Sequence, residues 1–496
     1  MTPVALTSRP GEDSIGRLST TGSLSEESPM SHPDDPDPKS QASLPRRRFL
    51  AGAAATAGFT IVPRHVLGGQ GVTAPSDKLN IAAVGVGGMG KNNVEKCALT
   101  ENIVALCDVD FAFADPVFQK YPGAKRYRDF REMLDKQPEI DAVIVATPDH
   151  SHTVVAMAAM KRKKHVYVQK PLTHNVAEAR LLTEAARQYG VRTQMGNQGH
   201  SGEGIRLLCE WVWDGAIGPI HEAHAWTNRP VWPSGIEVGR PSETPPVPPG
   251  LDWDLWIGPA QPRPFHPTYH PAKWRAWWDF GTGSLGDMAC HIVDPLFWSL
   301  KLKYPTSVEA NISKYWEAFF VETKPRNEMF PRSTIVRFRF PAREGMPEVD
   351  LTWWDGGLMP ARPATLEPGR RMGDDDGGIL LIGEKGSIMA NCYGESPRLI
   401  PETLMQQYKR PRRTLERIPE GQDGHEADWI RACKTGKPAS SNFDYSGPLS
   451  EMVLMGNLAI RFPDRQLLWN GEAMKVTNDA DADAYVRPTY REGWQA

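Results

Sequence analysis

The chain has 496 residues, enough for two or three domains with separate hydrophobic cores. Its 40% hydrophobic content is ordinary for a globular protein, and its net charge of −3 lacks the basic surplus of proteins that bind nucleic acid or anionic membranes, so we expect neither partner. Six scattered cysteines, without a C-x-x-C pair, favour neither a disulfide framework nor a zinc site, and we predict no metal.

Residues 1–45 form a leader rich in Ser, Pro, Asp and Glu, which is predicted to be disordered because it has too few apolar groups to bury. Residues 46–74 begin with Arg46 and Arg47, then Phe-Leu and a short Ala/Gly-rich run, and resemble a twin-arginine export signal. We therefore expect the twin-arginine export machinery as a partner and a periplasmic or other extracytoplasmic location, reached by a protein that folds with its cofactor first. The alternative is a basic linker before an Ala-rich helix, and Met30 is an alternative start.

Residues 78–198 are predicted to form an NAD-binding Rossmann domain. A strand from Leu79 to Val84 runs directly into Gly85, Gly87 and Gly90, the G-x-G-x-x-G spacing of a dinucleotide-binding turn. A helix from about Met89 would then direct its positive N-terminus at the phosphates.

Strands and helices alternate through the rest of this domain, which predicts a parallel, doubly wound sheet. Strands are expected at 102–110, 124–128, 141–147, 165–169 and 191–195, and helices at 130–136, 151–164 and 175–189. Asp108 lies 23 positions beyond Gly85, near the spacing at which an acid binds the adenosine ribose hydroxyls. Its carboxylate would repel a 2′-phosphate and so favours NAD over NADP, although it could also merely cap the strand.

Two loops at the carboxyl ends of these strands carry polar side chains, and ligands of open α/β sheets bind at that edge. One loop holds Thr147, Pro148 and two histidines, His150 and His152, which either line the cofactor cleft or cap the next helix. The other holds Gln169 and Lys170, and we expect Lys170 to face the nicotinamide.

Residues 199–480 are predicted to form a second, α+β domain, followed by a tail at 481–496. Ten of the 16 tryptophans fall between Trp211 and Trp298, and a Pro-rich loop spans 233–250. Aromatic faces suit the apolar faces of sugar rings, but packing against a sheet or burial in a subunit contact explains most of these residues equally well.

The stretch 281–294, G-T-G-S-L-G-D-M-A-C-H-I-V-D, predicts a helix on which Asp287 and His291 share one face, one turn apart. A carboxylate beside an imidazole raises its basicity and orients it for proton transfer. The alternative is a capping Asp and a structural His. Consecutive strands follow, which imply a large open, mainly antiparallel sheet, with two covering helices. The strands are expected at 306–315, 333–340, 349–354 and 378–390, and the two helices, at 424–435 and 448–462, would cover the sheet or close back on the first domain. A further helix is expected earlier, at 202–218.

Four motifs in this order resemble the Gfo/Idh/MocA oxidoreductases, which include glucose–fructose oxidoreductase and inositol dehydrogenase. They are V-G-V-G-G-M-G at 84–90, A-T-P-D-H-S-H at 146–152, V-Y-V-Q-K-P-L at 166–172 and the stretch at 281–294. The third usually reads E-K-P in the family, and Gln169 here replaces the Glu. The resemblance spans about residues 78–461.

The resemblance implies a site in which Lys170, Asp287 and His291 meet over the nicotinamide of NAD. It implies hydride transfer to or from a sugar or polyol carbinol carbon. His291 would exchange the hydroxyl proton, Asp287 would orient His291, and Lys170 would bind the reacting oxygen. Two alternatives remain: a glycosidase that oxidises its substrate transiently, and a non-catalytic NAD- or sugar-binding protein. Relatives also suggest a homo-oligomer, a dimer or a tetramer.

The predicted cofactor-binding residues are Gly85, Gly87, Gly88, Met89, Gly90, Asp108, Thr147, Pro148, His152, Gln169 and Lys170. The predicted substrate-binding residues are Tyr269, His270, Trp274, Arg275 and His291.

Overall fold

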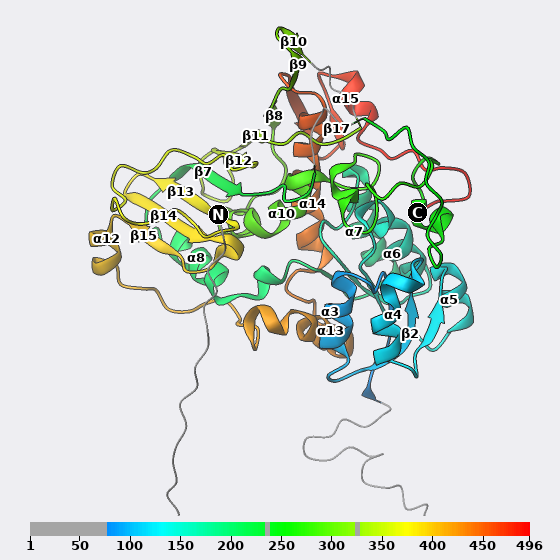
Figure 1. The fold of residues 1–496 in the computed structure, drawn as a ribbon. Coiled ribbons are helices and arrows are strands. Elements are labelled where there is room, and N and C mark those ends of the chain that lie inside the picture. The colour runs from blue at the N-terminus through cyan, green and yellow to red at the C-terminus, as the bar shows by residue number, and fades with distance from the viewer. Residues whose placement is uncertain (1–76, 234–238, 323–327) are drawn as a thin grey trace, which may run out of the picture. The chain divides into compact units, whose positions relative to one another are not determined.

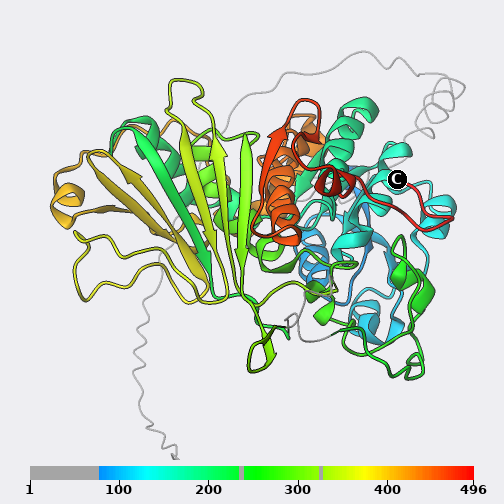
Figure 2. The same cartoon turned by 90° about the horizontal axis from the view of Figure 1, so that it is seen from above.

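The structure, a computed structural model, describes residues 77–233, 239–322 and 328–496. The predicted leader and export signal lie outside these residues. The described residues fall in one compact unit, in which two β-sheets flank a central helix, α14 (Figures 1 and 2). Across the described ranges, no helix combines the length and apolar character needed to cross a membrane.

The first sheet has six parallel strands in the order β3-β2-β1-β4-β5-β6, which confirms the doubly wound fold. Its strands are β1 (Asn80–Val84), β2 (Asn102–Cys107), β3 (Lys125–Tyr127), β4 (Ala142–Val145), β5 (His165–Val168) and β6 (Thr193–Met195). The strand order reverses between β1 and β4, and such a switch point opens a crevice at the carboxyl ends of the strands.

Five helices connect these strands: α3 (Met89–Cys97), α4 (Phe111–Lys120), α5 (Phe130–Lys136), α6 (His152–Lys161) and α7 (Val176–Tyr189). Helix α4 was not predicted from the sequence, because its three phenylalanines and internal Pro116 obscure a helical pattern. Its start is nevertheless well defined, because the Asp110 carboxylate accepts hydrogen bonds from the amides of Ala112 and Phe113.

The second sheet has nine strands in the order β15-β14-β13-β7-β12-β11-β8-β16-β17. Its strands are β7 (Ile220–Thr227), β8 (Ser307–Ile312), β11 (Thr334–Phe340), β12 (Val349–Trp354), β13 (Gly377–Gly383), β14 (Gly386–Asn391), β15 (Arg398–Ile400), β16 (Gln466–Asn470) and β17 (Lys475–Val476). Among the described strands of this sheet, only β7 and β12 pair in parallel, so the sheet is mainly antiparallel, as predicted. The single strand predicted at 378–390 was wrong, because the chain turns at Glu384–Lys385 and forms the hairpin β13–β14. A separate two-stranded ribbon, β9 (Trp316–Ala318) and β10 (Val321–Glu322), projects from the molecule (Figure 1).

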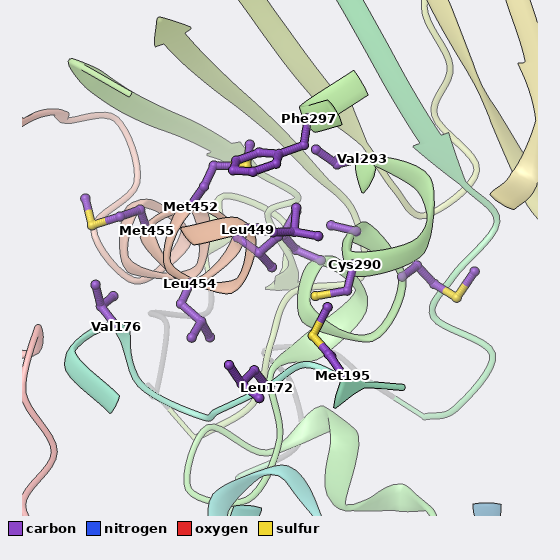
Figure 3. Packing of buried hydrophobic residues seen from close by; sticks show 14 of the residues in the cluster. Leu172, Val176, Met195, Cys290, Val293, Phe297, Leu449, Met452, Leu454 and Met455 are labelled. Carbon is purple, nitrogen blue, oxygen red and sulfur yellow. The ribbon is translucent and has the colours of Figure 1, made fainter. Parts of the chain in front are cut away.

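The helices of the second half are α8 (Glu203–Trp213), α9 (Trp253–Ile257), α10 (Gly283–Ile292), α11 (Asp294–Ser299), α12 (Glu402–Gln407), α13 (His425–Thr435), α14 (Phe443–Arg461) and α15 (Ala480–Ala484). Helix α14 packs on both halves of the fold. In Figure 3 its Leu449 and Met452 lie near Val293 and Phe297, and its Leu454 points towards Leu172. One continuous apolar core therefore fixes α10 relative to the Rossmann sheet, which matters because α10 carries Asp287 and His291.

Candidate active site

A cavity of about 410 Å³ opens at the carboxyl ends of β1 and β4 and reaches α10. Lys170, Asp287 and His291 line it together with Gly85, Gly87, Gly88 and Met89 of the glycine loop, whereas Gly90 is not among the lining residues. Most of the predicted cofactor-binding residues and the catalytic residues thus share one space. This volume is within the range of small-molecule and cofactor pockets.

The glycine loop provides what a pyrophosphate needs. Gly85 has a φ of +82°, which favours glycine, and Gly90 packs so closely that a Cβ atom there would lie 2.0 Å from the Gly85 carbonyl oxygen. A Cβ at Gly88, in contrast, meets nothing within 4 Å, and Gly88 lines the cavity. Helix α3 begins here with no side-chain cap and no acid in its first turn, so its first amides are available to an anion.

Asp108 organises this loop. One carboxylate oxygen accepts hydrogen bonds from the amides of Val86 (2.8 Å) and Gly87 (3.1 Å), and the other accepts from the amide of Asp110 (3.0 Å). Burial raises the pKa of Asp108, while these bonds lower it. Asp108 lines the cavity, and Oδ1, which accepts only one of these bonds, keeps a second lone pair for a ribose hydroxyl. The residues present therefore fit NAD.

Lys170 and Asp287 form an ion pair in the cavity wall. The Lys170 ammonium donates to Asp287 Oδ1 at 2.9 Å and to the Asp287 carbonyl oxygen at 2.6 Å, and Arg275 Nε lies 3.2 Å from the same Oδ1. Burial opposes ionisation of Asp287, but the charges of Lys170 and Arg275 outweigh it and hold its pKa well below its usual value. Asp287 is therefore a carboxylate shared by two cations.

His291 lies one turn further along α10 and is 4% exposed. No hydrogen bond joins it to Asp287 among the described residues; the carboxylate binds Lys170 and Arg275 instead, because these cations reach it directly. The His291 ring packs edge-on against Tyr393 at 4.7 Å, and its buried Nδ1 has no hydrogen-bond partner in the described structure. Burial, reinforced by the charge of Lys170, lowers the pKa of His291 well below its usual value, so the imidazole is neutral.

A further carboxyl group, Asp149, lines the same cavity and is 4% exposed. The Thr282 hydroxyl donates to its Oδ2 at 2.6 Å. Burial raises the pKa of Asp149 to about 6, against the opposing effects of Thr282 and Arg275. Asp149 belongs to the motif at 146–152, but its sequence context predicted no role for it.

The remaining predicted cofactor residues lie at the same strand ends. Thr147, Pro148, His152 and Gln169 line the cavity. The two ring nitrogens of His152 lie 2.8 Å from the carbonyl oxygens of Thr147 and Pro171, so this side chain braces the two loops together.

Gln169, which stands where the resembled family usually has Glu, belongs to a buried network. Its Nε2 donates to Asn93 Oδ1 at 2.9 Å, and Asn93 Nδ2 donates to the carboxylate of Glu426, on α13, at 2.6 Å. A buried carboxylate is thus still joined to this strand end, although it comes from a distant part of the chain. His150 has a structural position, between the carbonyl oxygens of Phe280 and Trp256.

The four predicted substrate residues from the Trp-rich region separate into three groups. Trp274 and Arg275 line the cavity beside Asp287, and the Arg275 guanidinium lies over the Trp274 ring at 4.3 Å. His270 also lines it, but binds Asp110 at 2.8 Å and lies against Phe113, near the glycine loop. Tyr269 is 2% exposed, packs against Trp277 and Phe280, and is not among the residues that line the cavity.

Further residues line the cavity that were not predicted from the sequence. Arg229 follows β7 and binds Asp376 at 3.0 Å, and Tyr393 follows β14 with a φ of +62°. Trp256 and Trp494 line another part of the wall. The clustering of tryptophans marked the region of Trp256, but no local signal distinguished Trp494 or Tyr393.

Sequence comparison matches two regions to one oxidoreductase family: residues 79–197 to its NAD-binding Rossmann fold and residues 226–318 to its C-terminal alpha/beta domain. An inositol 2-dehydrogenase of Salmonella paratyphi B is 29% identical over 154 residues, which are 29% of this chain and 46% of that protein. A myo-inositol 2-dehydrogenase of Thermotoga maritima is 27% identical over 157 residues, 31% of this chain and 47% of that protein. The chain thus spans about half the length of the curated relatives it matches.

Structure comparison gives broader coverage at lower identity. The WlbA dehydrogenase of Bordetella pertussis, solved with NADH and UDP-GlcNAcA, superimposes with a TM-score of 0.52 and 17% identity over 79% of this chain and 99% of that one. A levoglucosan dehydrogenase, solved with NADH and levoglucosan, gives the same TM-score, identity and coverage. At this identity the likeness shows a shared two-domain fold.

Proposed function

This chain belongs to the Gfo/Idh/MocA family of oxidoreductases, and from that premise we propose that it transfers a hydride between a sugar or polyol carbinol carbon and tightly bound NAD. The observation that carries this proposal is the single cavity shared by the glycine loop and by Lys170, Asp287 and His291. When bound, NAD supplies the redox chemistry, and the protein supplies binding, orientation and proton transfer.

Lys170 is suited to hold the reacting oxygen. An ammonium group has three N–H donors, and Asp287 accepts two of them, through its carboxylate and its carbonyl oxygen. The third is available to the substrate oxygen and would stabilise the negative charge that develops there during oxidation. Asp287 keeps the ammonium at the cavity wall, so it acts as a positioning residue for Lys170.

His291 is suited to take the hydroxyl proton. Because its pKa is lowered by burial, the imidazole is neutral near pH 7 and has a nitrogen lone pair to accept a proton. Among the described residues, His291 makes no ion pair with Asp287, so its orientation comes from packing against Tyr393. Loss of a general base typically costs about 10²- to 10⁴-fold in rate.

A sugar or polyol is the substrate class that fits these groups. The inositol and levoglucosan dehydrogenases named above act on such compounds by name. In this chain, Trp274 offers an aromatic face, and Arg229 and Arg275 offer N–H donors around the same cavity.

A second candidate is a glycosidase that oxidises its substrate transiently and returns the hydride after elimination. Elimination needs a group that can donate a proton to the departing oxygen, and Asp149 offers a second titratable group in the cavity, with a pKa of about 6. A screen of p-nitrophenyl glycosides without added NAD separates the candidates: chromophore release without net NADH favours the glycosidase.

The proposal is tested by releasing nucleotide from the denatured protein for mass spectrometry, and by following NADH formation with a panel of sugars and polyols. We expect NAD to be released and turnover with at least one member. His291→Ala and Lys170→Ala should each remove most turnover while still binding NADH. Near wild-type rates in both variants would refute the site assignment, and retained NADH binding without turnover of any substrate by the wild-type protein would favour a non-catalytic binding protein.

We further propose, from the sequence alone, export through the twin-arginine machinery. A cofactor that cannot be collected after export would be loaded first and held tightly. Replacing Arg46 and Arg47 with Lys should retain the protein in the cytoplasm, and unchanged export would refute this proposal. A dimer or tetramer, also proposed, is tested by light scattering on the purified protein.

A further inference from the structure

The chain that follows α15, residues 485–496, leaves the second half of the fold and returns to the Rossmann half. The carbonyl oxygen of Val486 accepts from the amide of Ala177 at 3.0 Å, and that of Tyr485 accepts from Asn175 Nδ2 at 3.2 Å. The Tyr490 hydroxyl donates to Glu178 at 2.5 Å. These bonds tie the segment to the start of α7, which lies beside the cavity's strand ends.

Arg491 then attaches the segment to α9. Its amide donates to the carbonyl oxygen of Pro259 at 3.0 Å, and its guanidinium donates to Asp254 Oδ1 at 2.7 Å and to the Asp254 carbonyl oxygen at 3.0 Å. The chain turns at Gly493, whose φ is +81°, and the amide of Trp494 donates to the carbonyl oxygen of Arg491 at 3.2 Å. Both ends of the turn are thus fixed, which sets the position of Trp494.

The Trp494 indole is 8% exposed and lines the cavity. Its ring centroid lies 6.1 Å from that of Phe130, and the Arg131 guanidinium lies over the ring at 4.5 Å. Leu255 and Trp256, on α9, line the cavity as well. The segment and α9 therefore add an aromatic and apolar wall to a pocket whose opposite side is the Rossmann sheet.

The chemistry of the cavity indicates which part of a dinucleotide this wall would meet. The uncapped start of α3 suits the pyrophosphate, and Asp108, at the end of β2, suits the adenosine ribose. Lys170 and His291 lie at the end of the cavity where the nicotinamide would react with the substrate. Phe130 begins the helix after β3, the strand next to β2, so the aromatic wall is on the adenosine side of Asp108.

We propose that Trp494 is a cofactor-binding residue that packs against the adenine base of NAD, and that residues 485–496 close the dinucleotide site. An aromatic wall suits a flat, apolar base, and the Arg131 and Arg491 guanidiniums lie over the Trp494 ring at 4.5 and 5.6 Å. This inference rests on NAD binding in the proposed function. It also gives a structural reason for a resident cofactor, because the contact with Trp494 would have to break before release.

The test compares Trp494→Ala and Trp494→Phe with Trp469→Ala, a matched control. Trp469 is 6% exposed, lies on β16 and does not line the cavity. Binding of NADH, ADP-ribose and reduced nicotinamide mononucleotide is measured by fluorescence titration, with thermal unfolding of each variant in parallel. Stacking of a base on an aromatic ring is typically worth about 1–3 kcal/mol, so Trp494→Ala should weaken ADP-ribose and NADH about 5- to 150-fold.

The mononucleotide, which lacks adenine, should bind Trp494→Ala and wild type equally, and Trp469→Ala should bind all three ligands like wild type. Trp494→Phe keeps an aromatic ring and should lose less than about 5-fold in ADP-ribose affinity. If Trp494→Ala does not fold, Trp494→Phe provides the test, because ADP-ribose should quench less tryptophan fluorescence in this variant than in wild type. Unchanged ADP-ribose affinity in a folded Trp494→Ala, or unchanged quenching in Trp494→Phe, overturns this inference but leaves the proposed function standing. Failure of the wild-type protein to bind NADH overturns the proposed function with it.

Discussion

Lys170 and Asp287 lie 117 positions apart in the chain, yet the ammonium donates at 2.9 Å to the carboxylate and at 2.6 Å to the backbone carbonyl of the same residue. Both side chains are mostly buried, with 16% and 12% exposure. Removing the Asp287 carboxylate leaves the Lys170 ammonium without its partner charge, which is more costly than losing a surface ion pair, whereas removing Lys170 leaves Asp287 paired with Arg275.

We predict that Asp287→Asn lowers kcat about 10²-fold and that Lys170→Met lowers it at least as much, because Asp287 acts by positioning the ammonium. The double variant should be little worse than Lys170→Met alone, since a positioning residue has no effect once its partner is gone. The measurement is a double-mutant cycle on kcat. Additive losses would show that Asp287 acts independently of Lys170.

The pH dependence of kcat/KM should reflect the protonation of His291. The base must be neutral to accept a proton, and burial lowers the pKa of His291 well below 6.5. We therefore expect the acidic limb of kcat/KM for oxidation to lie below pH 6.5. Asp149, with a pKa of about 6, lines the same cavity, so the profile is repeated with Asp149→Asn. A limb at or above pH 6.5 in both proteins would contradict a neutral, buried base.

Asp149 should also make stability depend on pH. Its pKa is about 6 in the folded protein and 3.8 as an ordinary Asp, so the folded state holds the proton more tightly. The stability this contributes is fully present below about pH 4 and is lost as pH rises through 6. Asp149→Asn keeps an oxygen for the Thr282 hydroxyl and cannot ionise. The free energy of unfolding of Asp149→Asn, measured relative to that of wild type, should therefore rise by on the order of 3 kcal/mol between pH 4 and pH 8. Urea unfolding of both proteins at several pH values measures this difference in free energy. A difference that does not change with pH would refute the prediction.

Two glycines of one loop should differ in their effects. A Cβ at Gly90 would lie 2.0 Å from the Gly85 carbonyl oxygen, so Gly90→Ala should lower the free energy of unfolding by roughly 1–3 kcal/mol even without nucleotide. A Cβ at Gly88 meets no protein atom within 4 Å, and Gly88→Ala should leave that free energy nearly unchanged but weaken NADH binding, because the methyl group enters the cavity. Unfolding and NADH titration of both variants measure these effects. Equal NADH affinity in Gly88→Ala and wild type would contradict a phosphate at this loop.

The features that depend on neighbours in the chain were predictable from the sequence. The strand before Gly85 and the alternation of strands and helices up to Met195 are local patterns, and they identified the doubly wound sheet. Helix α4 was missed because Pro116 and a run of phenylalanines mask its periodicity, and the hairpin β13–β14 was read as one strand because a two-residue turn leaves little trace. Strand β7 was missed too, since its central place between β12 and β13 is a matter of pairing and not of pattern.

The catalytic candidates divide in the same way. Spacing placed Asp287 and His291 on one face of α10 but suggested that they bind each other. Asp287 instead binds Lys170, 117 positions away, and Arg275, 12 positions before it. The sequence by itself determined the nucleotide-binding turn and the helix face that carries His291, because each is encoded within a few residues. Only the tertiary structure decided that Asp287 holds Lys170, that Asp149 shares their cavity and that Trp494 lines it, because these contacts join segments more than 100 residues apart and depend on how both sheets pack around α14.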